Sequence, residues 1–192
     1  MAITGASGAP YGIHLLRELL QLDVHVHLVV SSSAITVMKE ELGLKFGPSG
    51  FDLETYVGRT VPAGRVVMHD DKNLAAGPAS GSFRHDGMVI CPCSMKTLAS
   101  IAHGTGGSLI TRAADACLKE RRRLVVVPRE TPLSLIHLKN MVAVTEAGAI
   151  VLPAMPGFYN KPSSIDDIIR HLVMKILDVL RLEHDIKMRW KD

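Results

Sequence analysis

Short apolar runs alternate with amphipathic segments along the chain, and this alternation predicts a succession of strands and helices. The apolar runs predict strands at residues 2–4, 24–30, 65–69, 88–91, 124–127 and 149–152. Apolar residues at spacings of three and four predict helices at 11–22, 34–42, 135–146 and 164–182. Two more helices are predicted on either side of a turn at 104–107: one begins at 94 or 95 and ends at that turn, and the other runs from the turn to 119. The glycine- and proline-containing stretch 43–64 is expected to be irregular, with one helical turn.

Strands that alternate with helices favour a doubly wound, mostly parallel sheet. We therefore predict an α/β fold, a Rossmann-like or flavodoxin-like three-layer sandwich in which residues 1–192 form one domain. Four consecutive apolar residues at 124–127 are typical of a strand covered on both faces. The helix at about 164–182 is expected to close the domain or a subunit interface. Ligands of such sheets bind beyond the carboxyl ends of the strands, so the segments that follow the strands are candidate sites.

Composition narrows the class of protein. The 192 residues are 47% hydrophobic and 21% charged, the balance of a folded globular chain. A net charge of +3 indicates no basic surface for nucleic acid, and the apolar runs are far shorter than the roughly 20 residues that span a bilayer. Three cysteines cannot form a disulfide framework, and no signal peptide is recognised. We expect a soluble cytoplasmic protein with no membrane or nucleic-acid partner.

The segment Thr4–Ala9 joins the first predicted strand to the first predicted helix and is made of small residues. Small residues let main-chain N–H groups and a helix N-terminus approach an anion. The segment matches neither the GxGxxG nor the P-loop pattern, which disfavours the common nucleotide sites. A phosphate or cofactor site is one interpretation, and a tight turn with a capping serine is the other.

The segment Cys91–Thr97 follows a buried strand that Pro92 is expected to end. Ser94 and Thr97 can cap the next helix and can also offer hydroxyl groups to a phosphate. The Cys-x-Cys spacing is poor for structural zinc, so we expect no metal.

Two further candidate segments follow predicted strands. Arg129 and Glu130 combine a cation with a carboxylate, which suits either a phosphate clamp with an acid–base neighbour or a structural ion pair. In the rigid segment 153–159, Tyr159 can donate to a phosphate or belong to a loop that closes the core. The basic run 119–123 ends a helix, where cations complement the helix dipole.

Together these segments resemble one family. In order and spacing they are similar to the UbiX-type flavin prenyltransferases, within the flavodoxin-like flavoprotein superfamily that also holds phosphopantothenoylcysteine decarboxylases. The resemblance covers nearly the whole chain and rests on TGASGA at 4–9, PASGS at 78–82, CPCSMKT at 91–97, LKERR at 118–122, VPRETP at 127–132 and PAMPGFY at 153–159.

The resemblance implies that reduced FMN is bound as a substrate and not as a redox catalyst. Family members join a dimethylallyl group from dimethylallyl monophosphate to N5 and C6 of the flavin, without a metal. The product, prenylated FMN, is the cofactor of partner UbiD-type decarboxylases. The resemblance also implies a homo-oligomer, commonly a dodecamer, with sites at subunit contacts.

The motifs indicate which residues of this sequence correspond to the family's site residues. The residues implied to line FMN are Gly5, Ala6, Ser7, Ser31, Ser94, Met95, Lys96, Thr97 and Arg129. Ser7 would lie near the flavin N5 and relay its proton, and Glu130 would manage protons on the departing phosphate. Lys119 and Tyr159 would bind the prenyl phosphate. Glu41 is the second carboxylate that the resemblance brings to the site.

One position departs from the family's pattern. The arginine of the last helix that holds the prenyl phosphate corresponds here to Lys175. A lysine keeps the charge but loses the bidentate fork, so phosphate affinity or donor preference is expected to differ.

Two alternative functions stay open. A flavin-dependent cysteine decarboxylase of the same superfamily is disfavoured because the segment 92–97 lacks the asparagine of those enzymes, although His14 lies in the first predicted helix. A non-enzymatic flavin carrier is disfavoured by the slightly basic charge and by the single serine at 5–8.

Overall fold

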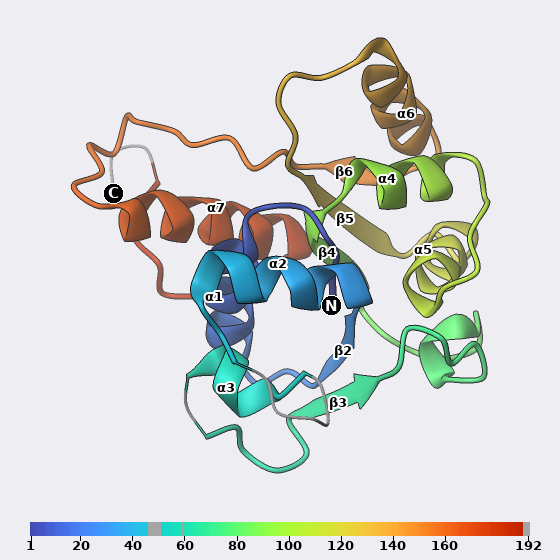
Figure 1. Ribbon diagram of the computed structural model, residues 1–192, viewed down its shortest axis with the longest axis horizontal. Coiled ribbons are helices and arrows are strands. Elements are labelled where there is room, and N and C mark those ends of the chain that lie inside the picture. Colours follow the sequence, from blue (N-terminus) through green and yellow to red (C-terminus); the bar gives the residue numbers. More distant parts are fainter. Residues whose placement is uncertain (46–50, 59, 190–192) are drawn as a thin grey trace.

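The computed structural model describes residues 1–45, 51–58 and 60–189. At its centre lies a six-stranded sheet in the order β3-β2-β1-β4-β5-β6, in which all neighbouring strands are parallel (Figure 1). The strands are β1 (Ala2–Ile3), β2 (Val26–Val30), β3 (Val66–His69), β4 (Gly87–Cys93), β5 (Arg123–Pro128) and β6 (Ile150–Val151). The chain moves outward from β1 in one direction and, from β4, in the other. The predicted doubly wound sheet is confirmed.

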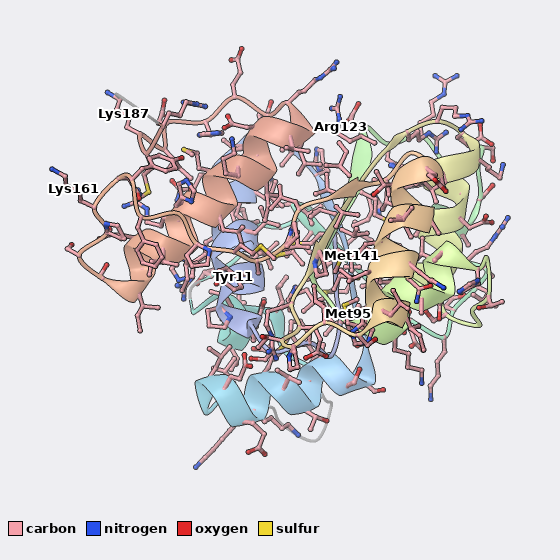
Figure 2. All side chains as sticks on the ribbon, turned by 90° about the horizontal axis from the view of Figure 1, so that it is seen from above. Tyr11, Met95, Arg123, Met141, Lys161 and Lys187 are labelled. Carbon is pink, nitrogen blue, oxygen red and sulfur yellow. The ribbon has the colours of Figure 1, made fainter. Side chains whose placement is uncertain are left out.

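Helices cover both faces of the sheet. In the described residues they are α1 (Ala9–Leu19), α2 (Ser32–Leu42), α3 (Leu53–Val57), α4 (Met95–Ala102), α5 (Leu109–Lys119), α6 (Leu135–Glu146) and α7 (Ile165–Leu180), with a 3-10 turn at Gly77–Ala79. Figure 2 shows Tyr11 of α1 on one side of the sheet and Met95 of α4 with Met141 of α6 on the other. The predicted three-layer arrangement is therefore confirmed.

Each face of the sheet has its own apolar core, and β5 contributes to both. Val125 and Val127 pack with residues of α1 and α7, while Leu124 and Val126 pack with residues of α4 and α5. All four side chains are fully buried. The four consecutive apolar residues thus mark a strand covered on both faces, as the sequence predicts.

The end of β4 differs from the sequence prediction. Pro92 does not end the strand, because β4 continues to Cys93 with an irregular register after Ile90. Proline has no N–H to donate, and an irregular register is one of the places where a sheet accepts it. Its carbonyl oxygen accepts hydrogen bonds from the main-chain N–H and the hydroxyl of Thr4, at 3.2 and 2.9 Å. The end of β4 is thereby attached to the end of β1.

Helix boundaries follow the capping residues. Serine hydroxyls cap five helices, and each accepts from the main-chain N–H three residues later, at Ser31, Ser94, Ser108, Ser134 and Ser164. The helical turn predicted within 43–64 is α3, and positions 46–50 and 59 of that stretch lie outside the described residues. α1 begins two positions earlier than predicted, at Ala9, because its cap comes from elsewhere in the chain.

Candidate active site

The N-terminus of α1 is capped by a carboxylate from α2. Gly8 precedes α1 with a φ of 112°, in the left-handed region that favours glycine, and contributes no capping side chain. Oε2 of Glu41 accepts instead from the main-chain N–H groups of Gly8 and Ala9, at 2.9 and 2.8 Å. A negative charge here complements the helix dipole. Two of the amides that the sequence offers to an anion therefore hold Glu41.

Glu41 is ionised at neutral pH. Burial raises the pKa of its carboxyl, but hydrogen bonds from the Ser7 side chain and from the two amides, together with the charge of Arg129, outweigh burial. The pKa consequently lies below its usual value. Because an ionised carboxylate can only accept hydrogen bonds, the Ser7 hydroxyl is the donor in their contact.

Arg129 connects three parts of this edge of the sheet. It directly follows β5, and its Nε donates to the main-chain carbonyl oxygen of Ser7 at 3.1 Å. Its main-chain N–H donates to the carbonyl oxygen of Cys93, at the end of β4. No carboxylate in the described ranges forms an ion pair with Arg129, so the structural pair with Glu130 is not observed. The guanidinium therefore brings a positive charge to the carboxyl edge.

The start of α2 lies against the same loop. The hydroxyl of Ser31 accepts from the Ala34 N–H at 3.2 Å and lies 3.1 Å from the hydroxyl of Ser33. Gly5 approaches so closely that a Cβ at this position would lie 2.5 Å from Oγ of Ser33. The backbone at Gly5 therefore packs directly against Ser33, and a side chain at position 5 would clash with it.

The start of α4 contributes two further hydroxyl groups. Those of Ser94 and Thr97 lie 3.0 Å apart, and the buried Thr4 hydroxyl accepts from the Ser94 N–H at 2.7 Å. Lys96 is exposed, whereas the side chain of Met95 is buried in the core, so main-chain atoms are what Met95 can offer to a ligand. These groups follow β4 next to the loop after β1, where the strand order reverses and doubly wound sheets bind ligands.

Glu130 extends the same edge beyond Arg129. Its side chain is exposed, and Oε1 accepts from the main-chain N–H of Thr131 at 3.0 Å. The carboxylate is thus accessible to a ligand that lies against the carboxyl ends of the strands.

Tyr159 and Lys175 belong to a second cluster, formed by α7 and the segment that precedes it. The segment that carries Tyr159 leaves β6 and runs to the start of α7 (Figure 1). The hydroxyl oxygen of Tyr159 lies 2.6 Å from Nε2 of the buried His171, and the exposed Lys175 follows one helical turn later. Sequence analysis missed His171. Its spacing of four from Lys175, which puts both on one side of a helix, was the available signal.

Lys119 lies near the amino-terminal end of β5, whereas the cluster around Arg129 lies at the carboxyl ends of the strands. It ends α5 just before β5 begins, whereas Arg129 and Glu130 follow the end of β5. The six residues of β5 extend over about 20 Å. At its own edge Lys119 forms an ion pair with Glu120. One copy of the chain therefore does not bring Lys119 to the cluster around Arg129.

The thiols are poor candidates for chemistry. All three cysteines are free and buried. Burial raises the pKa of Cys93 to about 12 and that of Cys117 to about 11, so both stay protonated at neutral pH.

The described residues hold no group of three or more His, Cys, Asp or Glu side chains arranged to bind a metal ion. Over the same residues, no helix combines the length and apolar character that crossing a membrane requires.

Known proteins resemble this chain over nearly its whole length. The chain matches the family model described as Flavoprotein over residues 1–177. It is 50% identical over 190 residues to the flavin prenyltransferase UbiX of Alkalihalophilus pseudofirmus, covering 99% of this chain and 94% of the relative. The crystal structure of AnUbiX (PadA1) in complex with FMN and dimethylallyl pyrophosphate superposes with a TM-score of 0.84 at 44% identity, covering 99% and 96% of the two chains. A dodecameric FMN-dependent UbiX-like decarboxylase from Escherichia coli O157:H7 gives a TM-score of 0.85 at 43% identity, covering 100% of both chains.

The doubly wound parallel sheet, together with the match to the Flavoprotein family over residues 1–177, shows that the chain is a flavoprotein. At this level of identity over nearly the full length, the chain belongs to the UbiX-type flavin prenyltransferases. The family and enzyme class predicted from the sequence are confirmed, which favours them over the cysteine decarboxylase and the flavin carrier.

Proposed function

We propose that this enzyme joins the dimethylallyl group of dimethylallyl monophosphate to N5 and C6 of reduced FMN and so makes prenylated FMN. The observation that carries the proposal is the cluster of Ser7, Glu41 and Arg129. It unites a hydroxyl group, an ionised carboxylate and a cation at the edge where parallel sheets bind ligands. Membership of the flavin prenyltransferases supplies the reaction class.

The residues at this edge fit FMN. The hydroxyl groups of Ser31, Ser94 and Thr97 can form hydrogen bonds to a ligand, and Arg129 offers a positive charge to a phosphate. When bound, reduced FMN supplies the two ring positions that receive the prenyl group. We infer that the FMN ligands are Gly5, Ala6, Ser7, Ser31, Ser94, Met95, Lys96, Thr97 and Arg129.

Ser7 and Glu130 are the proposed proton carriers. The Ser7 hydroxyl is held by Glu41, so it is oriented to relay the proton that the flavin N5 gives up. Glu41 itself stays ionised and orients Ser7, because hydrogen bonds keep its pKa low. Glu130 is exposed beside Arg129 and can protonate the departing phosphate. Negative charge develops on that phosphate as its bond to carbon breaks, and nearby cations stabilise it.

The prenyl phosphate is assigned to Tyr159 and Lys175. Tyr159 offers a hydroxyl hydrogen, and the exposed Lys175 offers an ammonium group on the same side of α7 as the histidine partner of Tyr159. Lysine is a point charge without the planar fork of arginine, so we expect it to orient the phosphate less strictly.

A homo-oligomer would complete the site. On α6, the side chains of Leu135, Ile136, Leu138 and Val142 are between 45% and 70% exposed. Contiguous exposed apolar side chains mark interaction surfaces, and a second copy of the chain is the proposed partner. Since Lys119 lies about one strand length from Arg129, we infer that it reaches the prenyl phosphate in a neighbouring copy. The E. coli relative named above is a dodecamer, the assembly we propose here.

The family's chemistry also suggests the conditions of the reaction, the prenyl donor and the recipient of the product. We propose a metal-independent reaction in the cytoplasm, with prenylated FMN delivered to a UbiD-type decarboxylase. AnUbiX was crystallised with dimethylallyl pyrophosphate, so the diphosphate is the donor to compare with the monophosphate.

Replacing Glu130 tests the proposed chemistry. In Glu130→Gln the carboxyl proton donor is removed, so prenylation should fall by about 100-fold or more while FMN still binds. The matched control is Glu146→Gln, at an exposed carboxylate that ends α6, which should leave both unchanged. Product formation by Glu130→Gln at the wild-type rate would remove Glu130 from the mechanism.

A further inference from the structure

His171 is a buried polar residue in direct contact with a proposed phosphate ligand. It lies on α7 with 6% of its surface exposed, and its Nε2 is 2.6 Å from the hydroxyl oxygen of Tyr159. The two rings meet edge to face, with centroids 5.2 Å apart. A Cβ at Gly157 would lie 3.1 Å from ring atoms of both residues, so the preceding loop packs closely on the pair.

The surroundings of His171 determine which ring nitrogen carries the hydrogen. Burial, and then the charge of Lys175, lower the pKa of His171, so the ring is neutral at neutral pH and carries one N–H hydrogen. Among the described residues, its buried Nδ1 has no hydrogen-bond partner. A hydrogen on Nδ1 would be a buried unpaired N–H donor, an arrangement that proteins rarely tolerate. The hydrogen therefore belongs on Nε2, which donates to Tyr159.

This tautomer fixes the direction of the Tyr159 hydroxyl. An oxygen that accepts from Nε2–H cannot also donate to Nε2, so its own hydrogen points to another acceptor. The fully ionised phosphate of a monoester offers acceptor oxygens only, and a charge-assisted O–H···O bond to it is strong. With the opposite tautomer, Tyr159 would donate to His171 and present a lone pair to the phosphate.

We propose that His171 is a positioning residue that holds the Tyr159 hydroxyl as a hydrogen-bond donor toward the phosphate of the prenyl donor, beside Lys175. This inference rests on the proposed function, in which Tyr159 and Lys175 bind that phosphate. His171 acts through Tyr159 and does not itself contact the substrate.

Two substitutions separate orientation from packing. His171→Phe keeps a ring of similar size but removes the donor, and it should weaken binding of dimethylallyl monophosphate to the FMN-loaded protein by about tenfold. His171→Gln restores an N–H near the position of Nε2, and it should recover most of that affinity. Calorimetry of the monophosphate gives the affinities, and FMN affinity should be unchanged in both variants. A histidine that only fills space would be replaced equally well by phenylalanine.

A double-mutant comparison tests whether the effect passes through Tyr159. In a Tyr159→Phe background, His171→Phe should cause no further loss of monophosphate affinity. A further loss there of the full size, or unchanged affinity in the single variant, would overturn the inference. If the wild-type protein with FMN does not bind the monophosphate, both the inference and the proposed function fail. Binding that is insensitive to His171 overturns the inference alone.

Discussion

The Nε atom of Arg129 donates a hydrogen bond to the main-chain carbonyl oxygen of Ser7 at 3.1 Å, across 122 positions of sequence. The contact joins the end of β5 to the loop between β1 and α1. Ser7 in turn contacts Glu41, which caps α1 from α2. Three segments far apart in the chain are thus connected at this site, and a substitution in any of them should alter the proposed FMN site.

The planar guanidinium geometry of Arg129 should contribute to FMN affinity in addition to its charge. Arg129→Lys keeps the charge, but one ammonium group cannot both contact Ser7 and bind the FMN phosphate as we propose for the planar guanidinium. We expect FMN affinity to fall by about tenfold in Arg129→Lys and by more in Arg129→Ala. Flavin fluorescence titration measures it, with Arg84→Lys, at an exposed position, as the control. Equal FMN affinity in Arg129→Lys and wild type would show that charge alone is sufficient.

The cap that Glu41 provides should be sensitive to acid. Its pKa in the folded protein lies below the usual value of 4.5, so its stabilising effect is fully present above that value and is lost as pH falls through the lower, folded pKa. Glu41→Gln should cost about 0.5 kcal/mol at neutral pH, the low end for helix caps, because the carboxylate is exposed to solvent.

Thermal unfolding from neutral to acidic pH measures this effect. The stability difference between wild type and Glu41→Gln should shrink in acid, and the neighbouring exposed Glu40→Gln should show no such trend. A difference that stays constant across the range would mean that the ionised cap does not stabilise α1.

Position 5 should tolerate no side chain. In Gly5→Ala the new Cβ would lie 2.5 Å from Oγ of Ser33, so the loop or the start of α2 must shift. We expect a loss of about 1–3 kcal/mol in the free energy of unfolding and weaker FMN binding. Gly107→Ala is the matched control, because nothing lies within 4 Å of its added Cβ. Chemical denaturation compares them, and equal stabilities would disprove the close approach.

The exposed face of α6 should hold copies of the chain together. Leu138 and Val142 are one helical turn apart, and a carboxylate at each would be desolvated in an apolar interface. The variant Leu138→Glu/Val142→Glu should therefore form a smaller species than wild type in light scattering. Met68→Glu, on β3 at a residue of similar exposure, should leave the assembly intact. Assemblies of equal size in all three proteins would exclude α6 from the interface.

Most of the fold could be predicted from the sequence because its signals are local. The short apolar runs located the six strands of the sheet, and the run at 124–127 indicated that β5 is covered on both faces. The errors arose where a residue distant in the sequence determines the local structure. Pro92 stays within β4 because the ladder is irregular there, and α1 starts at Ala9 because its cap, Glu41, lies on another helix. Neither the irregular register of β4 nor the cap from Glu41 can be predicted from the neighbouring sequence.

The candidate site could be predicted in part, through motifs. The motifs and the strand-end rule indicated Ser7, Arg129 and their neighbours, and the structure brings these two residues into contact. His171 was missed because its spacing of four from Lys175 indicates a shared helix side but not the contact with Tyr159. Lys119 shows another limit, because a sequence does not reveal whether two residues meet within one copy or between copies. Its role stays a prediction.

The central claim is that this protein prenylates FMN. The direct test is anaerobic incubation with reduced FMN and dimethylallyl monophosphate, followed by mass spectrometry of the released flavin. The account predicts a flavin heavier by one dimethylallyl unit, formed only when the protein is present. Recovery of unmodified FMN, with the diphosphate donor failing as well, would contradict it.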